Sequence, residues 1–327
     1  MKIYDMFILI IWEKSFARYI MILERGEIMS IRCEEIQWEP YGKCALLTNG
    51  EAEIIVTLDV GPRIMRYAKA GGSNILAEKL PNARETEWGT YRLKGGHRIW
   101  HAPEAMPRSY EPDDEPVESW CPTQRGIRVR QRTETHAGMQ KELELVLDDE
   151  GTGVRLVQKL TNRNAWPVEA ALWSLTVVTT GGWQIIPVPR HDTGLLHNRT
   201  LTLWPYTHMN DERVRWGDRL IYLKQDPQAK EPFKLGIDGR DGWAAYWLHD
   251  LLFIKRYQPQ PGAIYPDGGM TYETFTNHAI MEIETLSPMM RMAPGEGIEH
   301  EERWVLKEGV TLSLSDPEEV ARYIESC

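Results

Sequence analysis

From residue 43 onward, short apolar segments alternate with residues that favour turns. Segments 43–48 and 51–59 flank Asn49-Gly50, a dipeptide that strongly favours a two-residue β-hairpin. Residues 126–135 include IRVRQRT, which alternates with the period of two expected of a strand with one buried face. A second hairpin is predicted around DDEGTG at 148–153. The first part of the chain therefore predicts antiparallel strands.

Apolar runs of strand length continue to the C-terminus, and the longest covers 168–178. The other predicted strands are 63–68, 142–147, 154–161, 183–187, 200–204, 219–223, 233–237, 243–249, 252–257, 279–285 and 302–306. The best helix candidate follows Ser315, where Ser315 or Asp316 would cap a helix that has Pro317 and acidic residues in its first turn. Many short strands and little helix predict one large antiparallel all-β domain over residues 30–327.

The first 29 residues do not share this pattern. Their apolar run, 7–12, is interrupted by Glu13 and Lys14 and is too short to cross a bilayer. No small-residue cleavage site follows it, which argues against a signal peptide. We interpret 1–29 as an N-terminal extension, with Met29 as the candidate for the native start, and expect no function there.

Composition and net charge argue against several classes of binding partner. The chain has 327 residues, 42% hydrophobic and 26% charged, which is typical of a globular protein. A formal net charge of −10 argues against nucleic acid and against an anionic membrane surface, because both require clustered Lys and Arg. The four cysteines lack the spacing of a metal site or a disulfide framework, so we expect reduced thiols in a cytoplasmic protein. No cofactor is predicted.

The aromatic residues favour a carbohydrate ligand. Thirteen Trp and 13 Tyr stand against 5 Phe, and both of the common types combine a flat apolar face with a polar group. Such faces stack on the C–H side of sugar rings, although most individual tryptophans are expected to belong to the core.

GGHRIWHAPE, residues 95–104, is the first cluster with candidate chemistry. His97 and His101 lie four residues apart, which on a helix would suit a metal ion. Two glycines and Pro103 argue against a helix, so an extended segment is expected, with His97 and His101 on one face and Arg98 pointing away. We interpret the cluster as the polar wall of a pocket, and the alternatives are a metal site or histidines that bond to the backbone at a strand end.

YPDGGMTYETFTNHAIMEIETLSP, residues 265–288, is the second cluster. Asp267 belongs to a predicted turn, and Glu273, Asn277 and His278 are polar groups close to a strand. Glu282 and Glu284 would share one strand face. If that face is buried, the pKa of one carboxyl should rise, which would prepare a general base; the alternative is a solvated acidic face.

A third segment, APGEGIEHEERWVL at 293–306, begins with a Pro-Gly turn and continues as a strand. Its histidine, His300, is flanked by acidic residues and is expected on the solvated surface.

The order of these motifs resembles the galactose mutarotase-like (aldose 1-epimerase) superfamily and, more closely, an uncharacterised bacterial branch of it. The chain carries GPRI at 61–64, GG-x-RI at 95–99, IETLSP at 283–288 and APGE at 293–296 before a closing strand. The resemblance covers roughly residues 30–310. It implies a β-supersandwich of large antiparallel sheets, to which the predicted C-terminal helix is added.

The resemblance also implies catalytic roles. In that family a glutamate in an LETQ-like strand takes the proton of the anomeric hydroxyl, and the matching residue here is Glu284. An arginine in the early RI strand holds sugar hydroxyls, and Arg98 matches it. The family's histidine, which protonates the ring oxygen, is missing: the matching stretch, 171–183, has Trp173 and Ser174 there instead.

Three hypotheses follow, and the expected partner is a small-molecule saccharide. The first is a carbohydrate-binding protein with an aldose 1-epimerase-like pocket, acting as an isomerase with Glu284 as base and His97, His101 or His278 as acid. Its predicted substrate-binding residues are Arg98, Trp100, Glu104, Asp267, Glu273 and Asn277. The second is a non-catalytic carbohydrate-recognition domain, since the central histidine is missing. The third is a metal-dependent lyase or hydrolase built on His97, His101 and a carboxylate.

A phosphorylated sugar would require basic groups near the mouth of the pocket. Arg63, Arg66 and Arg98 are the candidates that the sequence offers.

Overall fold

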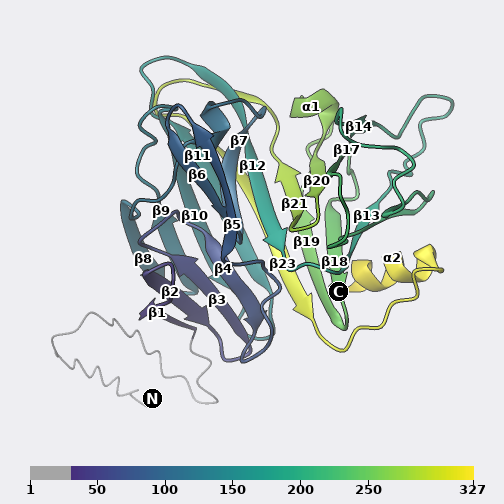
Figure 1. Ribbon diagram of the computed structural model, residues 1–327, viewed down its shortest axis with the longest axis horizontal. Coiled ribbons are helices and arrows are strands. Elements are labelled where there is room, and N and C mark those ends of the chain that lie inside the picture. The colour runs from purple at the N-terminus through teal and green to yellow at the C-terminus, as the bar shows by residue number, and fades with distance from the viewer. Residues whose placement is uncertain (1–30) are drawn as a thin grey trace, which may run out of the picture.

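The computed structural model describes residues 31–327, so the predicted N-terminal extension lies outside the described residues (Figure 1). An 11-stranded antiparallel sheet forms the first of two packed layers. Its strands, in spatial order, are β1 (Arg32–Gln37), β2 (Lys43–Thr48), β3 (Ala52–Thr57), β4 (Ile64–Lys69), β7 (His97–Ala102), β12 (Val168–Val178), β21 (Met281–Leu286), β20 (Tyr272–Thr276), β17 (Phe233–Ile237) and β14 (Leu201–Leu203). The remaining strand, β22 (Met290–Met292), pairs with β12.

A 10-stranded sheet lies against the first. Its order is β15 (Val214–Arg215), β16 (Leu220–Lys224), β13 (Trp183–Pro187), β18 (Trp243–Leu248), β19 (Leu251–Tyr257), β23 (Gly297–Lys307), β11 (Val154–Asn162), β10 (Met139–Leu147), β9 (Gly126–Arg130) and β8 (Ser119–Thr123). A separate hairpin is formed by β5 (Leu80–Thr86) and β6 (Gly89–Lys94). The large antiparallel sheets predicted from the sequence are confirmed.

Asn49 shows how the predicted turns fix this arrangement. Its side-chain oxygen accepts hydrogen bonds from the backbone N–H groups of Glu51 and Ala52, which closes the β2–β3 turn. Its amide donates to the carbonyls of Asp148 and Gly151, both at 2.9 Å, in the turn between β10 and β11. One side chain therefore joins the two predicted hairpins, which belong to opposite sheets.

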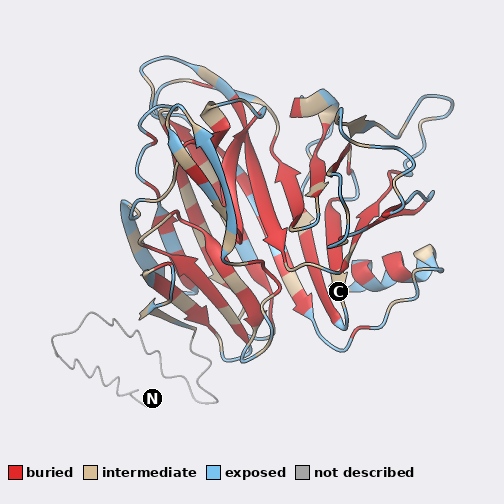
Figure 2. Ribbon diagram, in the orientation of Figure 1, coloured by how far each residue is buried: buried red, intermediate tan, exposed pale blue. Residues whose placement is uncertain are grey.

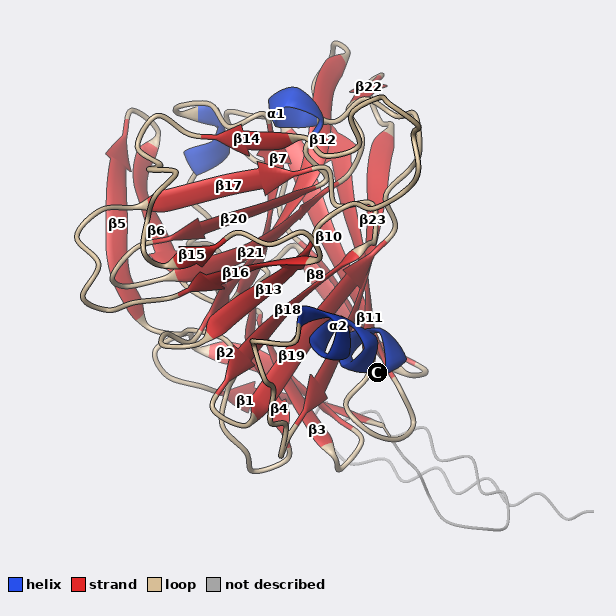
Figure 3. Cartoon of the chain, turned by 90° about the vertical axis from the view of Figure 1, so that its right-hand side faces the viewer, coloured by secondary structure: helices blue, strands red, loops and turns tan. Residues whose placement is uncertain are grey.

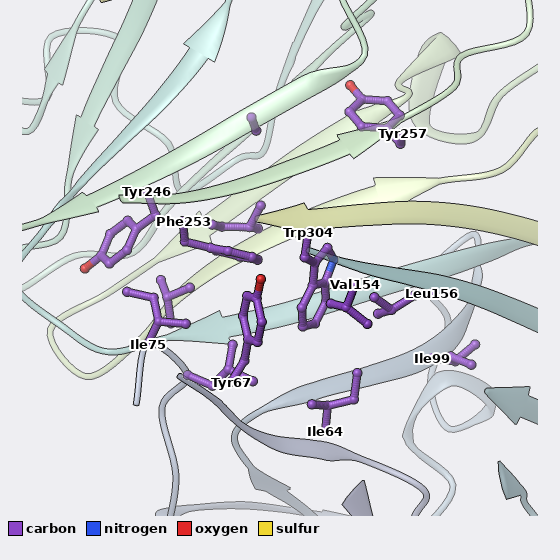
Figure 4. Packing of buried hydrophobic residues seen from close by; sticks show 14 of the residues in the cluster. Ile64, Tyr67, Ile75, Ile99, Val154, Leu156, Tyr246, Phe253, Tyr257 and Trp304 are labelled. Carbon is purple, nitrogen blue, oxygen red and sulfur yellow. The ribbon is translucent and has the colours of Figure 1, made fainter. Parts of the chain in front are cut away.

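The main core fills the space between the two sheets, where Figure 2 shows mostly buried strands. Figure 4 shows part of this packing, including Tyr67, Phe253 and Trp304. The rings of Tyr67 and Phe253 meet edge to face at 5.9 Å, and those of Phe253 and Trp304 at 5.3 Å. Burial of apolar surface, to which such large rings contribute strongly, stabilises the packing of the two sheets.

The helices are short. The helix predicted after Ser315 is α2 (Pro317–Ser326), and its cap is Asp316, which accepts a hydrogen bond from the N–H of Glu319. Its apolar face, Val320, Ala321 and Ile324, packs on the outer face of the 10-stranded sheet, in front of β18 and β19 in Figure 3. A 3₁₀ turn, η1 (Arg108–Tyr110), and α1 (Pro266–Gly269) complete the regular structure.

One further sequence-based expectation concerns His300. The prediction that His300 lies on the surface is wrong, because β23 alternates buried and exposed residues and His300 falls on the buried side. Within residues 31–327, no helix has the length and apolar character needed to cross a membrane.

Candidate functional site

Strand register places the candidate residues in rows across the first sheet. One row joins Arg98, Leu175, Glu284 and Glu273, on β7, β12, β21 and β20. A parallel row, two residues away, joins Val177, Glu282, Phe275 and Lys234. Residues two apart on a strand share a face, so both rows project from the same face, the one turned away from the core.

A cavity of about 640 Å³ lies on this outer face. It is bounded by the strands of the sheet, by the β5–β6 hairpin and by segments 204–206 and 230–234. Figure 3 shows the hairpin standing upright beside β17 and β20. The aromatic residues of the lining are Tyr91, Trp100, Tyr110, Trp173, Trp204, Tyr206 and Phe275. The charged residues are Arg84, Arg98, Glu104, Lys230, Lys234, Glu282 and Glu284. Its volume and aromatic walls fit a small organic ligand.

Glu284 lies at the floor of the cavity and is fully buried. The indole N–H of Trp173 donates to its Oε2 at 2.9 Å, while Oε1 has no hydrogen-bond partner in the protein. Burial raises the pKa of Glu284; the charge of Lys234 opposes that rise, and the charge of Glu282 adds to it. Glu284 is therefore a carboxyl that exchanges a proton near neutral pH and has one oxygen free for a ligand.

Lys234 links Glu284 to a second buried carboxyl. Its Nζ lies 2.8 Å from Oε2 of Glu273 and 3.6 Å from Oε2 of Glu284. The ammonium also lies over the rings of Trp173, at 4.6 Å, and Trp204, at 4.4 Å. Burial also raises the pKa of Glu273. Lys234 is thus shared by two buried carboxyls, and the charge of Glu284 adds to the rise in the pKa of Glu273.

Arg98 forms the opposite side of the floor. Its Nη2 donates to Glu282 Oε1 at 3.0 Å, and its guanidinium lies 4.6 Å from the ring centre of Trp100. Nε and Nη1 have no hydrogen-bond partner in the protein, although the side chain is only 4% exposed. Buried donors are normally satisfied, so these two N–H groups indicate a place for a ligand oxygen.

The structure places His97 and His101 away from the cavity. Alternation along β7 puts both histidines on one face and Arg98 on the other, as predicted, but the histidines face inward and the cavity lies on the face of Arg98 and Trp100. The nitrogens of His97 bind Thr176 Oγ1 at 2.9 Å and Gln158 Oε1 at 3.1 Å, and burial lowers its pKa to about 3. The positions of both histidines contradict the prediction that they supply the acid of this site.

His101 has its own polar partner. Its Nε2 lies 3.5 Å from Oε2 of Glu134, whose carboxylate also pairs with the buried ammonium of Lys141. Across residues 31–327, no group of three His, Cys, Asp or Glu side chains could hold a metal ion. The metal-dependent alternative therefore has no ligand set among these residues to support it.

The other predicted residues divide between the cavity and its surroundings. Trp100, Glu104, Asn277 and His278 line it, and His278 is exposed at its rim. Glu273 lies behind the lining and reaches the cavity through Lys234. Asp267 is outside the lining: it occupies the predicted turn, now α1, with a left-handed φ of 54°.

Sequence reasoning missed Lys234. A signal was present, because Lys234 interrupts the apolar strand FKLGI, and a lysine at such a position is rarely buried without a partner. Trp204 and Tyr206 were also missed, and they lie on a loop that no alternation pattern would orient.

Several solved structures resemble this chain at low sequence identity. A TPR-domain containing protein from Parabacteroides distasonis matches with a TM-score of 0.58 and 14% identity over 84% of this chain, which spans 48% of that protein. A galactose mutarotase-like protein from Clostridium acetobutylicum matches with a TM-score of 0.51 and 10% identity, covering 85% of this chain and 99% of that one. One from Lactobacillus casei matches with a TM-score of 0.50 and 10% identity, covering 81% and 100%.

The chain therefore has a galactose mutarotase-like fold, and the β-supersandwich implied by the sequence motifs is confirmed. No protein-family profile matches the sequence. No curated protein matches it either.

Proposed function

We propose that the cavity binds an aldose and interconverts its anomers, with Glu284 as the general base. The observation that carries this proposal is the free Oε1 of a fully buried Glu284 at the floor of an aromatic cavity. Because its pKa is raised, the carboxylate is basic enough to take a proton from the anomeric hydroxyl near neutral pH.

The remaining residues position the sugar. Arg98 would donate its two unpartnered N–H groups to ring hydroxyls, and Trp100 and Trp173 offer apolar faces. Lys234 takes the place of the missing histidine as the nearest cation to the base. Its pKa is raised because the neighbouring Glu284 and Glu273 charges outweigh the effect of burial, so it is protonated in the resting site and is the proposed proton donor to the ring oxygen as the C1–O5 bond breaks.

In this reaction Glu284 takes the O1 proton as C1=O forms, and the Lys234 ammonium transfers a proton to O5 as the C1–O5 bond breaks. After rotation about the C1–C2 bond, O5 bonds to the other face of C1 and returns its proton to Lys234, while Glu284 returns its proton to O1. Of the three histidines predicted as the acid, His278 is the one that lines the cavity, and it is the alternative donor of the O5 proton.

Glu284→Gln tests the catalytic role. The amide still accepts the Trp173 hydrogen bond but cannot take a proton, so anomer exchange should fall by about 10²–10⁴-fold. The measurement is NMR exchange between anomers on a panel of aldoses, with Glu299→Gln on the exposed face of β23 as the matched control. If the wild-type protein gives no more exchange than buffer for any sugar, the isomerase proposal is rejected.

A non-catalytic carbohydrate-recognition domain is the second candidate. Trp173 stands where the family has its acid histidine, and its indole binds the proposed base directly. This alternative expects sugar-dependent changes in tryptophan fluorescence, without anomer exchange, in wild type and Glu284→Gln alike.

A further inference from the structure

The charged groups of the cavity are not balanced. Its lining has four permanently basic side chains, Arg84, Arg98, Lys230 and Lys234, and three carboxyls, Glu104, Glu282 and Glu284. Each carboxyl already has a partner. Glu282 pairs with Arg98 and Glu284 lies beside Lys234, while Glu104 accepts a hydrogen bond from the Tyr110 hydroxyl. The lining therefore has one cation more than carboxyls, and two of the four cations form no ion pair with these carboxyls, in a chain whose net charge is −10.

Arg84 and Lys230 are these two cations. Both are exposed and line the mouth, Arg84 from β5 and Lys230 from the segment before β17. Neither pairs with a carboxylate of the described chain, unlike Arg92 on the same hairpin, whose Nη1 lies 2.7 Å from Asp114. The guanidinium of Arg84 lies 4.8 Å from the ring centre of Tyr110, which gives it a defined position over the aromatic wall.

Arg84 and Arg98 border the same group of aromatic rings. Trp100 contacts Tyr110 at 4.8 Å and Tyr91 at 5.4 Å, so a continuous wall connects the guanidinium over Tyr110 with the one over Trp100. The two unpartnered N–H groups of the buried Arg98 lie in this part of the cavity. The wall of Arg84 and Arg98 is thus rich in free donors, while the opposite side holds the Glu284–Lys234 pair.

The basic residues predicted from sequence do not account for this charge. Arg63 is fully buried and pairs with Asp113 at 2.8 Å, and Arg66 pairs with Glu53 at 2.8 Å. Neither lines the cavity, whereas Arg98 does.

We propose that the substrate is an aldose that carries an anionic group, a carboxylate or a phosphate monoester, which Arg84 and Lys230 bind at the mouth while its anomeric carbon reaches Glu284. A neutral sugar would leave both cations to solvent and counterions alone. A negative group supplies charge-assisted hydrogen bonds to Arg84 and Lys230 and orients the ring toward the floor. This inference rests on the proposed function and specifies its substrate class.

Calorimetric titration of the full chain with matched sugars tests it. The probes are D-glucose, D-glucuronate and D-glucose 6-phosphate, followed by the same three forms of D-galactose. We expect at least one anionic sugar to bind about tenfold or more tightly than its neutral parent. That preference should decrease between 50 and 500 mM NaCl, because the mouth is exposed and salt screens it. The stronger of the uronate and the phosphate identifies the anionic group.

Variants assign the preference to these side chains. Arg84→Gln with Lys230→Gln should remove the preference for the anion and leave the affinity for the neutral parent within about twofold. Arg92→Gln, which changes an exposed arginine of the same hairpin, should keep the preference. A neutral parent that binds as tightly as its anions, or a preference that survives the double variant, overturns the inference but leaves the proposed function standing. If no sugar of either kind binds, both are rejected.

Discussion

Strands β7, β12 and β21 carry polar residues on both faces, and the two faces differ in how those residues are satisfied. On the outer face, Arg98 and Glu284 retain polar atoms that have no partner in the protein. On the inner face, His97, Ser174 and Thr285 bind to residues of the opposite sheet. The same three strands therefore build a site for a ligand on one side and a closed polar network on the other.

The inner network is centred on Glu302. Its carboxylate pairs with Lys255 at 2.9 Å and accepts hydrogen bonds from Ser174, Thr285 and the indole of Trp304. Lys255 also donates to the carbonyl of Ile283, the residue before Glu284. Buried charges are tolerated when they are paired and hydrogen-bonded in this way.

The difference shows which buried polar residues indicate function. Both faces bury carboxyls and cations, so burial alone does not separate them. Hydrogen bonding separates the Glu302 network from the cavity: in the described chain, the side chains bonded to Glu302 have no buried polar atom without a partner, whereas Glu284 Oε1 and two nitrogens of Arg98 have no partner. Elsewhere on the inner face, His101 Nε2 also lacks a hydrogen bond and lies 3.5 Å from Glu134 Oε2. A native fold rarely leaves such atoms without partners unless a ligand or water completes them.

The largest effect is expected from Glu302→Ala on the inner face. Removing the carboxylate leaves Lys255 charged and buried without its partner, which should lower the free energy of unfolding by about 3–5 kcal/mol. Urea denaturation measures this. The matched control is Glu299→Ala on the same strand, which removes an exposed ion pair with Lys159 and should change stability by less than about 1 kcal/mol. Equal effects of the two changes would mean that the inner network is not what holds the sheets together.

The next largest effect is expected at acid pH, where the buried histidines of the inner face should lower the stability of the folded protein. Burial lowers the pKa of His97 to about 3 and that of His300 to about 4, below their values in the unfolded chain. Their stabilising contribution is therefore complete above about pH 6.5 and is lost as the pH falls toward 4 and then 3. Each histidine should contribute a slope approaching about 1.4 kcal/mol per pH unit in that window.

Unfolding free energies of wild type and His97→Gln between pH 7 and pH 4 measure this slope. Glutamine does not titrate, so the variant should show the smaller dependence on pH, whatever its stability at pH 7. Parallel curves for the two proteins would show that His97 is not buried in its neutral form.

The architecture could be read from the sequence because alternation and turn residues determine it locally. The segments 43–48, 168–178, 183–187 and 233–237 coincide with strands of the structure. Strands that local pattern did not reveal include β5 and β8, which are mostly exposed, and β20, whose residues are almost all buried. When both faces of a strand are exposed, or both are buried, its sequence does not alternate between apolar and polar residues.

The candidate site could be predicted only in part. The pairing of Glu282 with Glu284 on one face followed from alternation, and the register confirms it. Which face of β7 would meet the cavity did not follow, because both faces of that strand carry polar residues and all six residues are buried. Lys234 lies on β17 and Glu284 on β21, with β20 between them. The local sequence pattern of one strand does not predict a contact between side chains of different strands.

The smallest effect is expected for the unfolding free energy of Glu284→Gln. It is also the sharpest test of the difference between the outer and inner faces. Burial raises the pKa of Glu284, so its carboxyl stabilises the folded protein while protonated and loses that contribution as the pH rises through the raised pKa. Glutamine has no such loss. The variant should therefore match wild type near pH 5 and exceed it at pH 9 by on the order of 1 kcal/mol. Urea denaturation at the two pH values measures the difference. A loss of stability at both pH values, like that expected for Glu302→Ala, would instead make Glu284 part of the structural network, because a carboxyl kept for a ligand is not needed to hold the sheet together.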